Sequence, residues 1–409
     1  MTQLDLDFVR SQFPAFAEPS LQRWRFFENA GGSYACRQTI ERLTRFYTQT
    51  KVQPYGEYPA SQAAGQAMDE ALTRLAAYLS VETDELLVGP STTQNTYVLA
   101  QAFRAGWSEG DEIIVTDQDH EANIGAWRRL EETGIVVKEW SAEAESGGLL
   151  DPARLDGLLT ERTKLVAFTH CSNIVANPNP VAEIAAKARA VGARTVVDGV
   201  SYAPHGLPDV AALGADVYLF SAYKVYGPHQ GVMTVRRDCM AELANQSHYF
   251  NDAAPSKRLV PAGPDHAQVA ALNGVVDYFD ALHAHHFTDE AAPAERGRRT
   301  HDLMQAQERS VLAPLLEFLT ARNDLRVLGP TDAARRAPTV ACDTAKPPET
   351  IAKALSEHGI MAGWSDFYAP RILRRMGVDP ERGVLRLSFT HYTSAEDVEA
   401  LTEALDHVL

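Results

Sequence analysis

Residues 220–231, FSAYKVYGPHQG, place a lysine, Lys224, directly after an apolar run that is typical of a buried strand. Burial penalises a charged amine, so a lysine kept at such a position indicates a chemical use. His120, Asn173 and Asp198 each follow another β-branched run. Ligands of parallel α/β sheets bind beyond the carboxyl ends of the strands. We therefore expect these four side chains to form one site.

A second feature is the segment VGPSTTQNTYVLAQAF, in which Thr92 and Thr93 open an amphipathic helical pattern. Hydroxyl groups and free N–H groups at a helix N-terminus bind anions such as phosphate. Taken alone, the segment is better explained by an ordinary Ser/Thr helix cap. No lysine follows as in a P-loop, and no GxGxxG opens a first strand–helix unit, so a dinucleotide site is not expected.

A phosphate cradle, a carboxylate, a lysine and an imidazole are together the groups that pyridoxal 5′-phosphate (PLP) requires. Its aldehyde needs a lysine amine for a Schiff base, and its pyridine nitrogen needs a carboxylate that keeps it protonated. Its ring can stack on an imidazole such as that of His120. These residues therefore predict PLP as the cofactor. The four cysteines lie far apart with no CxxC pair, so no metal site is expected.

The elements that must position these groups are short apolar runs that alternate with helical patterns. Such alternation predicts an α/β domain with a mostly parallel sheet covered on both faces. From about residue 290 the pattern changes to long charged helices and weaker strands. We expect a large domain over 51–288, a smaller α+β domain over 289–409, and an N-terminal segment, 1–50, that joins the small domain and the substrate loop. The predicted strands are residues 112–116, 134–140, 164–170, 194–200, 216–223 and 231–236.

The composition of the chain limits which partners and which cellular compartment are expected. The chain has 409 residues and a net charge of −16. An acidic chain repels nucleic acid and anionic membranes, so neither is expected as a partner. The N-terminus lacks the pattern of a signal peptide, and no stretch is long and apolar enough to span a bilayer. The separated cysteines fit a reducing compartment, which predicts a cytoplasmic protein.

The segment VVDGVSYAPHGLPDVAALGADVYLFSAYKVYGPHQGVM resembles the core of class V aminotransferases, the PLP fold-type I group that includes cysteine desulfurases. Further segments along nearly the whole chain are similar to that family: RFFENAGGSYACRQTIERL, DQDHEANIGAW, THCSNIVANPNPVAEI and GVLRLSFTHYTSAEDVEAL. The resemblance implies a large domain with a mixed, mostly parallel sheet, a small C-terminal domain and a homodimer.

The resemblance also implies a role for each matching residue. Lys224 forms the Schiff base and, once released, acts as the base at the substrate Cα. Asp198 pairs with the pyridine nitrogen, His120 stacks on the ring, and Asn173 bonds the ring hydroxyl. Phosphate contacts are expected from Thr92, Thr93, Ser221 and Tyr223. On the substrate side, the resemblance implies Arg386 as the carboxylate clamp and the backbone of Asn29, Ala30 and Gly31 as lining.

The chain departs from the desulfurase pattern in three places. Desulfurases carry a catalytic cysteine on a loop of the small domain, whereas the comparable segment here, GIMAGWSDFYAPRIL, has none. Ser201, expected at the cofactor, replaces a glutamine. The segment VPAGPDHAQ, where many relatives offer a hydroxyl to the partner subunit's phosphate, has Asp265 and His266 instead.

Several reactions are compatible with these residues. We expect a desulfurase-like C–S lyase that acts on L-cysteine or a cysteine derivative without a catalytic cysteine. The alternatives are an amino-acid aminotransferase or epimerase and, third, a non-catalytic PLP-binding regulator, which predicts an appended DNA-binding module that is not visible. WSDFYAPRIL and QPYGEY (53–58) either line the substrate pocket or pack in the core.

Overall fold

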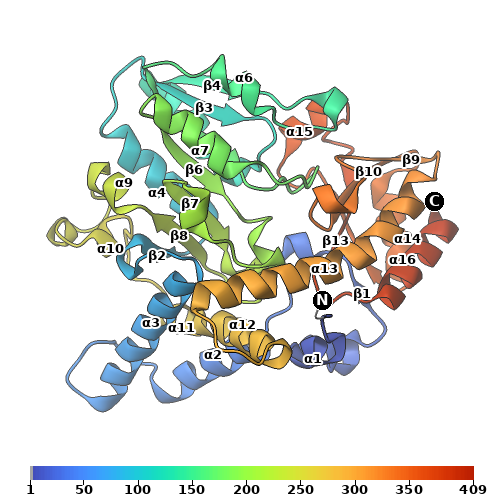
Figure 1. Cartoon of the computed structure of the whole chain (residues 1–409), viewed down its shortest axis with the longest axis horizontal. Coiled ribbons are helices and arrows are strands. Elements are labelled where there is room, and N and C mark those ends of the chain that lie inside the picture. The colour runs from blue at the N-terminus through green and yellow to red at the C-terminus, as the bar shows by residue number, and fades with distance from the viewer. Residues whose placement is uncertain (1–2) are drawn as a thin grey trace.

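The computed structural model describes residues 3–409, in which a large mixed sheet forms one part and a small antiparallel sheet the other (Figure 1). The large sheet has seven strands in the order β2-β8-β7-β6-β5-β3-β4. Only β8 runs antiparallel to its neighbours. The predicted α/β fold with a mostly parallel sheet is therefore confirmed. The strands are β2 (Leu86–Gly89), β3 (Glu112–Thr116), β4 (Val136–Trp140), β5 (Thr163–Thr169), β6 (Arg194–Asp198), β7 (Val217–Ser221) and β8 (Gly231–Val235).

Helices cover both faces of this sheet because its strands are apolar on both sides. Along β7, Val217 and Leu219 belong to the core beneath α4 and α5, whereas Tyr218 and Phe220 belong to the opposite core beneath α3 and α7. The helices of this part are α2 (Arg37–Gln49), α3 (Pro59–Tyr78), α4 (Thr92–Arg104), α5 (Glu121–Arg128), α6 (Pro152–Asp156), α7 (Val181–Ala190), α8 (Val210–Leu213), α9 (Arg237–Glu242), α10 (Pro255–Arg258), α11 (His266–Ala271) and α12 (Asn273–His286).

The C-terminal part is built on a four-stranded antiparallel sheet in the order β12-β13-β10-β9. The long helix α13 runs from beside α12 to this second sheet (Figure 1). The N-terminal segment joins this part, since β1 pairs in parallel with β11. Its elements are α1 (Leu6–Ser11), β1 (Arg25–Phe26), α13 (Pro293–Thr320), β9 (Leu325–Val327), β10 (Thr339–Thr344), α14 (Pro348–Glu357), β11 (Ile360–Met361), β12 (Gly363–Ser365), α15 (Pro370–Arg375), β13 (Val384–Ser388) and α16 (Ala395–Val408).

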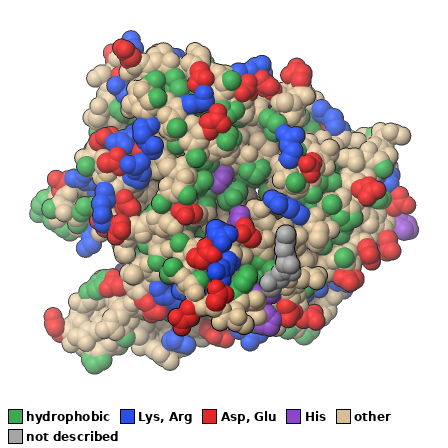
Figure 2. Space-filling model, in the orientation of Figure 1, with side chains coloured by type: hydrophobic (Ala, Val, Ile, Leu, Met, Phe, Trp, Pro, Cys, Tyr) green, Lys and Arg blue, Asp and Glu red, His purple; other side chains and the backbone are tan. Residues whose placement is uncertain are grey.

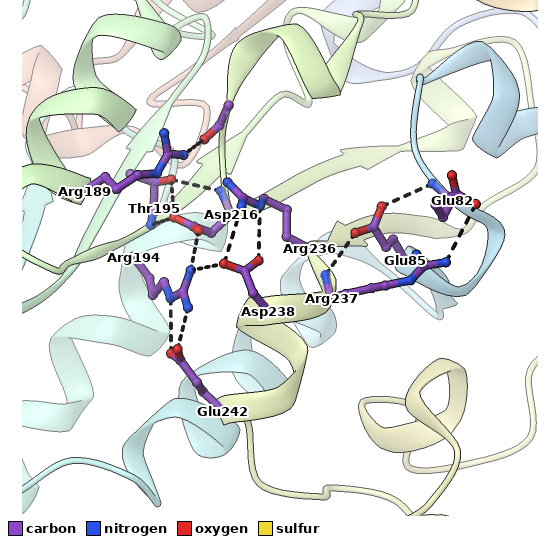
Figure 3. A network of polar contacts seen from close by, with 11 residues as sticks. Glu82, Glu85, Arg189, Arg194, Thr195, Asp216, Arg236, Arg237, Asp238 and Glu242 are labelled. Atoms are coloured by element: carbon purple, nitrogen blue, oxygen red, sulfur yellow. Dashed lines mark hydrogen bonds and ion pairs between the residues drawn. The ribbon is translucent and has the colours of Figure 1, made fainter.

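Charged side chains of both signs are interspersed over the face drawn in Figure 2. At the amino-terminal edge of the large sheet, Arg194, the first residue of β6, is surrounded by the carboxylates of Asp216, Asp238 and Glu242, which we call the Arg194 cluster (Figure 3). No helix among residues 3–409 is long and apolar enough to cross a membrane.

Candidate active site

At the opposite, carboxyl-terminal edge of the large sheet lies a cavity of about 160 Å³, which we call the strand-end cavity. It contains all nine residues that the sequence predicts for the cofactor. The structure thus brings the two predicted clusters, the strand ends and the start of α4, into one place. The lining residues are Ser91, Thr92, Thr93, His120, Ala122, Thr169, Cys171, Asn173, Asp198, Val200, Ser201, Ser221, Tyr223, Lys224 and His229.

Lys224 stands one short 3-10 turn beyond β7, and only 9% of it is exposed. Burial, reinforced by the charge of Arg386, lowers the pKa of Lys224 to about 8, although Asp198 and Glu28 act in the opposite direction. A surface lysine titrates near pH 10.4, so this amine has a far larger neutral fraction at physiological pH. Lys224 is therefore a buried amine that is able to act as a nucleophile or a base.

Asp198 is the last residue of β6 and is buried beside the lysine. Its Oδ1 accepts a hydrogen bond from the Val200 N–H at 2.8 Å. Burial raises the pKa of Asp198 to about 6, and the positive charge of Lys224 offsets part of that effect. At pH 7 the carboxyl is mostly ionised, and it has no ion-pair partner among the described residues. A negatively charged carboxylate of this kind stabilises the protonated form of a basic group on a bound ligand.

His120 caps the N-terminus of α5, as its Nδ1 accepts a hydrogen bond from the Ala122 N–H at 2.9 Å. Because Nδ1 accepts, the neutral imidazole carries its proton on Nε2. Burial lowers the pKa of His120 to about 3, and the charges of Lys224 and Arg386 add to that effect. The ring is therefore a neutral, flat wall of the cavity as well as a helix cap.

Asn173 follows β5 and is buried with one polar atom unused. Its Nδ2 donates to the Phe367 carbonyl at 3.0 Å, while its Oδ1 has no hydrogen-bond partner among the described residues. Leaving a buried acceptor unpaired costs about 1–3 kcal/mol. That cost indicates a ligand donor at this wall of the cavity.

The start of α4 forms the far end of the strand-end cavity. Thr92 Oγ1 and Ser221 Oγ lie 2.7 Å apart, and the first-turn N–H groups of the helix have no intrahelical acceptor. Gly231 lets β8 approach this turn, since a Cβ there would lie 2.5 Å from Thr92 N. Hydroxyls and helix N–H groups at one point form an anion cradle. With the lysine, the carboxylate, the imidazole and the orphaned Asn173 Oδ1, these groups fit PLP.

Six lining residues received no cofactor role from the sequence, and two of them, His229 and Cys171, carry a titratable side chain. His229 stacks on Tyr223, with 4.7 Å between ring centroids and planes only 3° apart. Its only sequence signal is the preceding Gly227-Pro228 turn. Cys171 is buried, donates through Sγ to the Ala176 carbonyl at 3.3 Å, and has its pKa raised by burial to about 12. It is a packed thiol with a contact of its own.

Arg386 and the residues Asn29, Ala30 and Gly31 lie outside the lining of the strand-end cavity. Arg386 points from β13 to Glu28, and its Nη2 lies 2.8 Å from Glu28 Oε1. The Ala30 N–H donates to Ser388 Oγ at 2.9 Å, which ties the loop to the same strand. The predicted substrate-side residues thus form a second cluster next to the lysine.

The two aromatic segments that the sequence offered for the substrate pocket lie in different places. In QPYGEY, Tyr55 packs over Gly65 of α3 and donates to Asp69 at 2.9 Å, away from the cavity of its own chain. In WSDFYAP, Phe367 and Tyr368 have φ angles of 48° and 55°. Tyr55 has a positive φ of 66° as well, so the backbone does not distinguish the segments, but the Phe367 carbonyl accepts from Asn173 Nδ2 at the strand-end cavity. Only the second segment borders the site within one chain.

An outer pocket of about 550 Å³ continues from the strand-end cavity and shares Thr93, His120 and Tyr223 with it. Tyr368 and Arg371 from the small part form its opposite wall. The Glu121 N–H donates to the Tyr368 carbonyl at 2.8 Å, so this wall is joined to the start of α5. The outer pocket therefore borders the strand-end cavity that contains Lys224.

The chain is similar to known proteins over nearly its whole length. The family model "Aminotransferase class-V" matches residues 25–295 and 298–401. The "Aminotransferase-like protein FGM3" of Gibberella zeae is 33% identical over 100% of this chain and 99% of its own length. A cysteine desulfurase of Serratia proteamaculans is 27% identical over 98% of each chain. The crystal structure of the cysteine desulfurase CsdA from Escherichia coli superposes with a TM-score of 0.82, at 24% identity over 99% of this chain and 98% of the other.

Proposed function

The chain belongs to the class V aminotransferase family of PLP-dependent enzymes, and on that premise we propose that it is a C–S lyase acting on L-cysteine or a cysteine derivative. The observation that carries the proposal is the buried Lys224 amine, with a pKa near 8, in one cavity with Asp198 and Asn173. Relatives that are named cysteine desulfurases supply the sulfur-containing substrate class.

Each residue of the strand-end cavity has a proposed part in holding the cofactor. When bound, PLP would supply an aldehyde and an electron-withdrawing pyridine ring. Lys224 would hold it through the amine, Asp198 would keep a proton on the pyridine nitrogen, and His120 would cover one ring face. Asn173 and Ser201 would contact the ring substituents. Thr92, Thr93, Ser221 and Tyr223 would hold the phosphate with the N-terminus of α4.

Lys224 is also the proposed base at the substrate Cα. A base works best when its pKa lies near the operating pH, and burial brings the pKa of this amine to about 8. Arg386 would bind the α-carboxylate with its planar fork, and the Asn29–Gly31 backbone would border the substrate. These groups would hold the Cα–H bond in a fixed position relative to the Lys224 amine. Such positioning lowers the entropic part of the reaction barrier.

The lyase reaction requires no protein thiol. Once the Cα proton has moved to Lys224, the electron pair expels the sulfur substituent from Cβ as a thiolate or hydrosulfide ion. The proton held by Lys224 balances this charge, so that a thiol or hydrogen sulfide leaves. Addition of one water then gives pyruvate and ammonia. All four cysteines are buried, and none lies in the loop around Phe367 that borders the site. Desulfurisation through a protein persulfide is therefore not part of the proposal.

The test is a substrate screen on the holoenzyme that records cofactor absorbance and keto acid together. Cysteine, S-substituted cysteines and amino acids without a Cβ leaving group are compared. We expect equal amounts of pyruvate and ammonia, from sulfur-containing substrates only. Accumulation of the aminated cofactor with a range of amino acids, without pyruvate, would assign an aminotransferase instead. Exchange of the Cα proton with loss of chirality alone would assign an epimerase.

A homodimer is the proposed assembly. The segment near Asp265 is the part of the chain that relatives direct to the partner subunit, and just before it Tyr249 and Phe250 are 89% and 69% exposed. Large exposed aromatic side chains mark interfaces. Light scattering coupled to size exclusion should give twice the chain mass of 44.8 kDa. A single-chain mass with full activity would overturn this assembly.

We also retain the cytoplasm as the compartment and the division at residues 50 and 288. The four free, buried cysteines support a reducing compartment. The parallel pairing of β1 with β11 supports the assignment of the N-terminal segment to the C-terminal domain. Cell fractionation tests the first proposal. Limited proteolysis tests the second, because a cut near residue 288 should release a large fragment that retains the cofactor.

A further inference from the structure

Arg386, the proposed carboxylate clamp, is already paired with a carboxylate of its own chain. Only 3% of Arg386 is exposed, and its Nη2 donates to Glu28 Oε1 at 2.8 Å. One further nitrogen of the guanidinium, Arg386 Nε, and the second carboxylate oxygen, Glu28 Oε2, are both buried without a hydrogen bond. The charge of the guanidinium is thus balanced by Glu28, but its hydrogen-bonding capacity is not fully used.

The surrounding backbone makes room for this ion pair. Gly363 of β12 is the cross-strand partner of Arg386 in β13, and a Cβ at Gly363 would lie only 2.3 Å from Glu28 Oε2. A Cβ at Gly31 would lie 3.0 Å from Glu28 Oε1. The Phe367 ring covers the guanidinium, with 3.6 Å from Cζ to the ring centroid. The Glu28–Arg386 pair is therefore a built feature and not a chance surface contact.

We propose that Glu28 limits substrate affinity by occupying the carboxylate position on Arg386, so that a substrate α-carboxylate binds only by replacing it. This inference rests on the proposed function, because it concerns the substrate of the same site. Two carboxylates on one buried guanidinium repel each other strongly, so replacement is favoured over sharing. A half-buried Glu28 can swing to water, whereas the buried Arg386 cannot.

The exchange affects only ligands that carry a carboxylate. A ligand with an α-carboxylate restores the ion pair that Glu28 gives up, so the cost of moving Glu28 is offset. An amine without a carboxylate, such as cysteamine, offers nothing to the guanidinium and leaves the pair closed. Breaking a buried ion pair without a substitute is strongly unfavourable. Glu28 therefore lowers the affinity of the site for amino acids and leaves its affinity for amines without a carboxylate unchanged.

The first test measures binding of propionate, which has the carboxylate but no amine, to the holoenzyme by calorimetry, with propionamide as the uncharged probe. We expect Glu28→Gln to bind propionate about tenfold more tightly than the wild type, a difference of about 1.4 kcal/mol. Propionamide binding should not change. Glu349→Gln is the matched control, because Glu349 forms a surface ion pair with Lys353. It should leave propionate affinity unchanged.

A second variant keeps the charge of Glu28 and removes only its position. Glu28→Asp keeps the carboxylate but draws it back from Arg386 by one methylene group, so it should also tighten propionate binding, without removing a charge. In steady-state kinetics with the best cysteine substrate, both variants should lower KM. Arg386→Lys should weaken propionate binding in every background.

Three outcomes would overturn the inference. Weaker propionate binding by Glu28→Gln would mean that Glu28 orients Arg386. Unchanged binding would mean that the two carboxylates do not compete. Propionate binding that is insensitive to Arg386→Lys would place the carboxylate elsewhere. Failure of the proposed function is distinct: it would appear as an absence of borohydride-reduced adduct at Lys224, or of keto acid, while the propionate measurements would remain interpretable.

Discussion

Both ends of strands β6 and β7 carry acidic and basic residues, but these residues form ion pairs at one end of the strands and lie unpaired in a cavity at the other. At the amino-terminal edge, Arg194 contacts Asp216, Asp238 and Glu242 (Figure 3). At the carboxyl-terminal edge, Asp198 and Lys224 share a cavity without forming an ion pair. Both edges belong to one rigid sheet, so the difference comes from the partners that each side chain finds.

At the amino-terminal edge the charged groups are satisfied. Asp216 is buried, yet its Oδ2 accepts from the Thr195 N–H at 2.9 Å and from Thr195 Oγ1 at 3.0 Å. Hydrogen bonds to Glu242 and Asp238 raise the pKa of Arg194 further above its already high value. Groups held in this way remain charged, and their role is to stabilise the fold.

At the carboxyl-terminal edge burial dominates, and it drives each group toward its neutral form. The pKa of Lys224 falls to about 8, and that of Asp198 rises to about 6. Asn173 Oδ1 remains without a partner. Perturbed titration and unused polar atoms in one cavity are characteristic of functional sites. The presence of polar groups without partners, rather than of charged groups in general, therefore indicates where the active site lies.

The largest expected effect follows removal of the amine. Lys224→Ala should lower kcat/KM by at least about 10³-fold, because both the covalent anchor and the base are lost. Borohydride reduction followed by peptide mass mapping should find the cofactor on Lys224 in the wild type and on no lysine in the variant. Lys187→Ala, which removes a surface ion pair with Asp156, is the control and should trap normally. A trapped adduct at another lysine would refute the assignment.

The next largest effect distinguishes the two edges of the sheet by the same Asp→Asn substitution at each edge. Asp198→Asn should lower kcat/KM by about 10²–10⁴-fold with little loss of stability, because the buried carboxylate is poorly solvated. Asp216→Asn should leave kcat/KM near the wild-type value and lower the free energy of unfolding by about 1–3 kcal/mol, since its acceptor bonds are lost. Steady-state kinetics and urea unfolding of both variants measure the two effects. The comparison fails if each variant changes both quantities equally.

The pKa shifts also predict opposite slopes of stability with pH in the apoenzyme. Lys224 has its pKa lowered from 10.5 to about 8, so the unfolded chain binds more protons between these values and stability rises with pH. Asp198 has its pKa raised from 3.8 to about 6, so the folded chain binds more protons there and stability falls with pH. Each shift corresponds to about 3 kcal/mol.

Urea unfolding across both pH windows measures these slopes. Lys224→Met should flatten the rise above pH 8, and Asp198→Asn should flatten the fall between pH 4 and pH 6. Asp216→Asn provides the reference from the other edge of the sheet. An unchanged profile in the Lys224→Met variant would show that the amine is as well solvated as a surface lysine.

The sequence predicted the class of fold and the strand-end groups because both depend on local patterns. Apolar runs that alternate with helices define the sheet, and the residue after each run defines its edge, which placed Lys224 and Asp198 correctly at one cavity. The pairing of Arg386 with Glu28 could not be predicted. It joins residues far apart in the chain and depends on the β12–β13 register and on the missing Cβ of Gly363. The approach of His229 likewise depends on the geometry of a turn.

The smallest expected effect concerns the exposed side of the Arg194 cluster. Glu242 is more than half exposed, so its pairing with Arg194 is screened by water and salt. Glu242→Gln should lower the free energy of unfolding by about 0.2–1 kcal/mol at low salt and by less at high salt, with kcat/KM unchanged. Urea unfolding at two ionic strengths measures this loss. A loss as large as that of Asp216→Asn would show that the whole cluster, and not its buried carboxylate alone, fixes the amino-terminal edge.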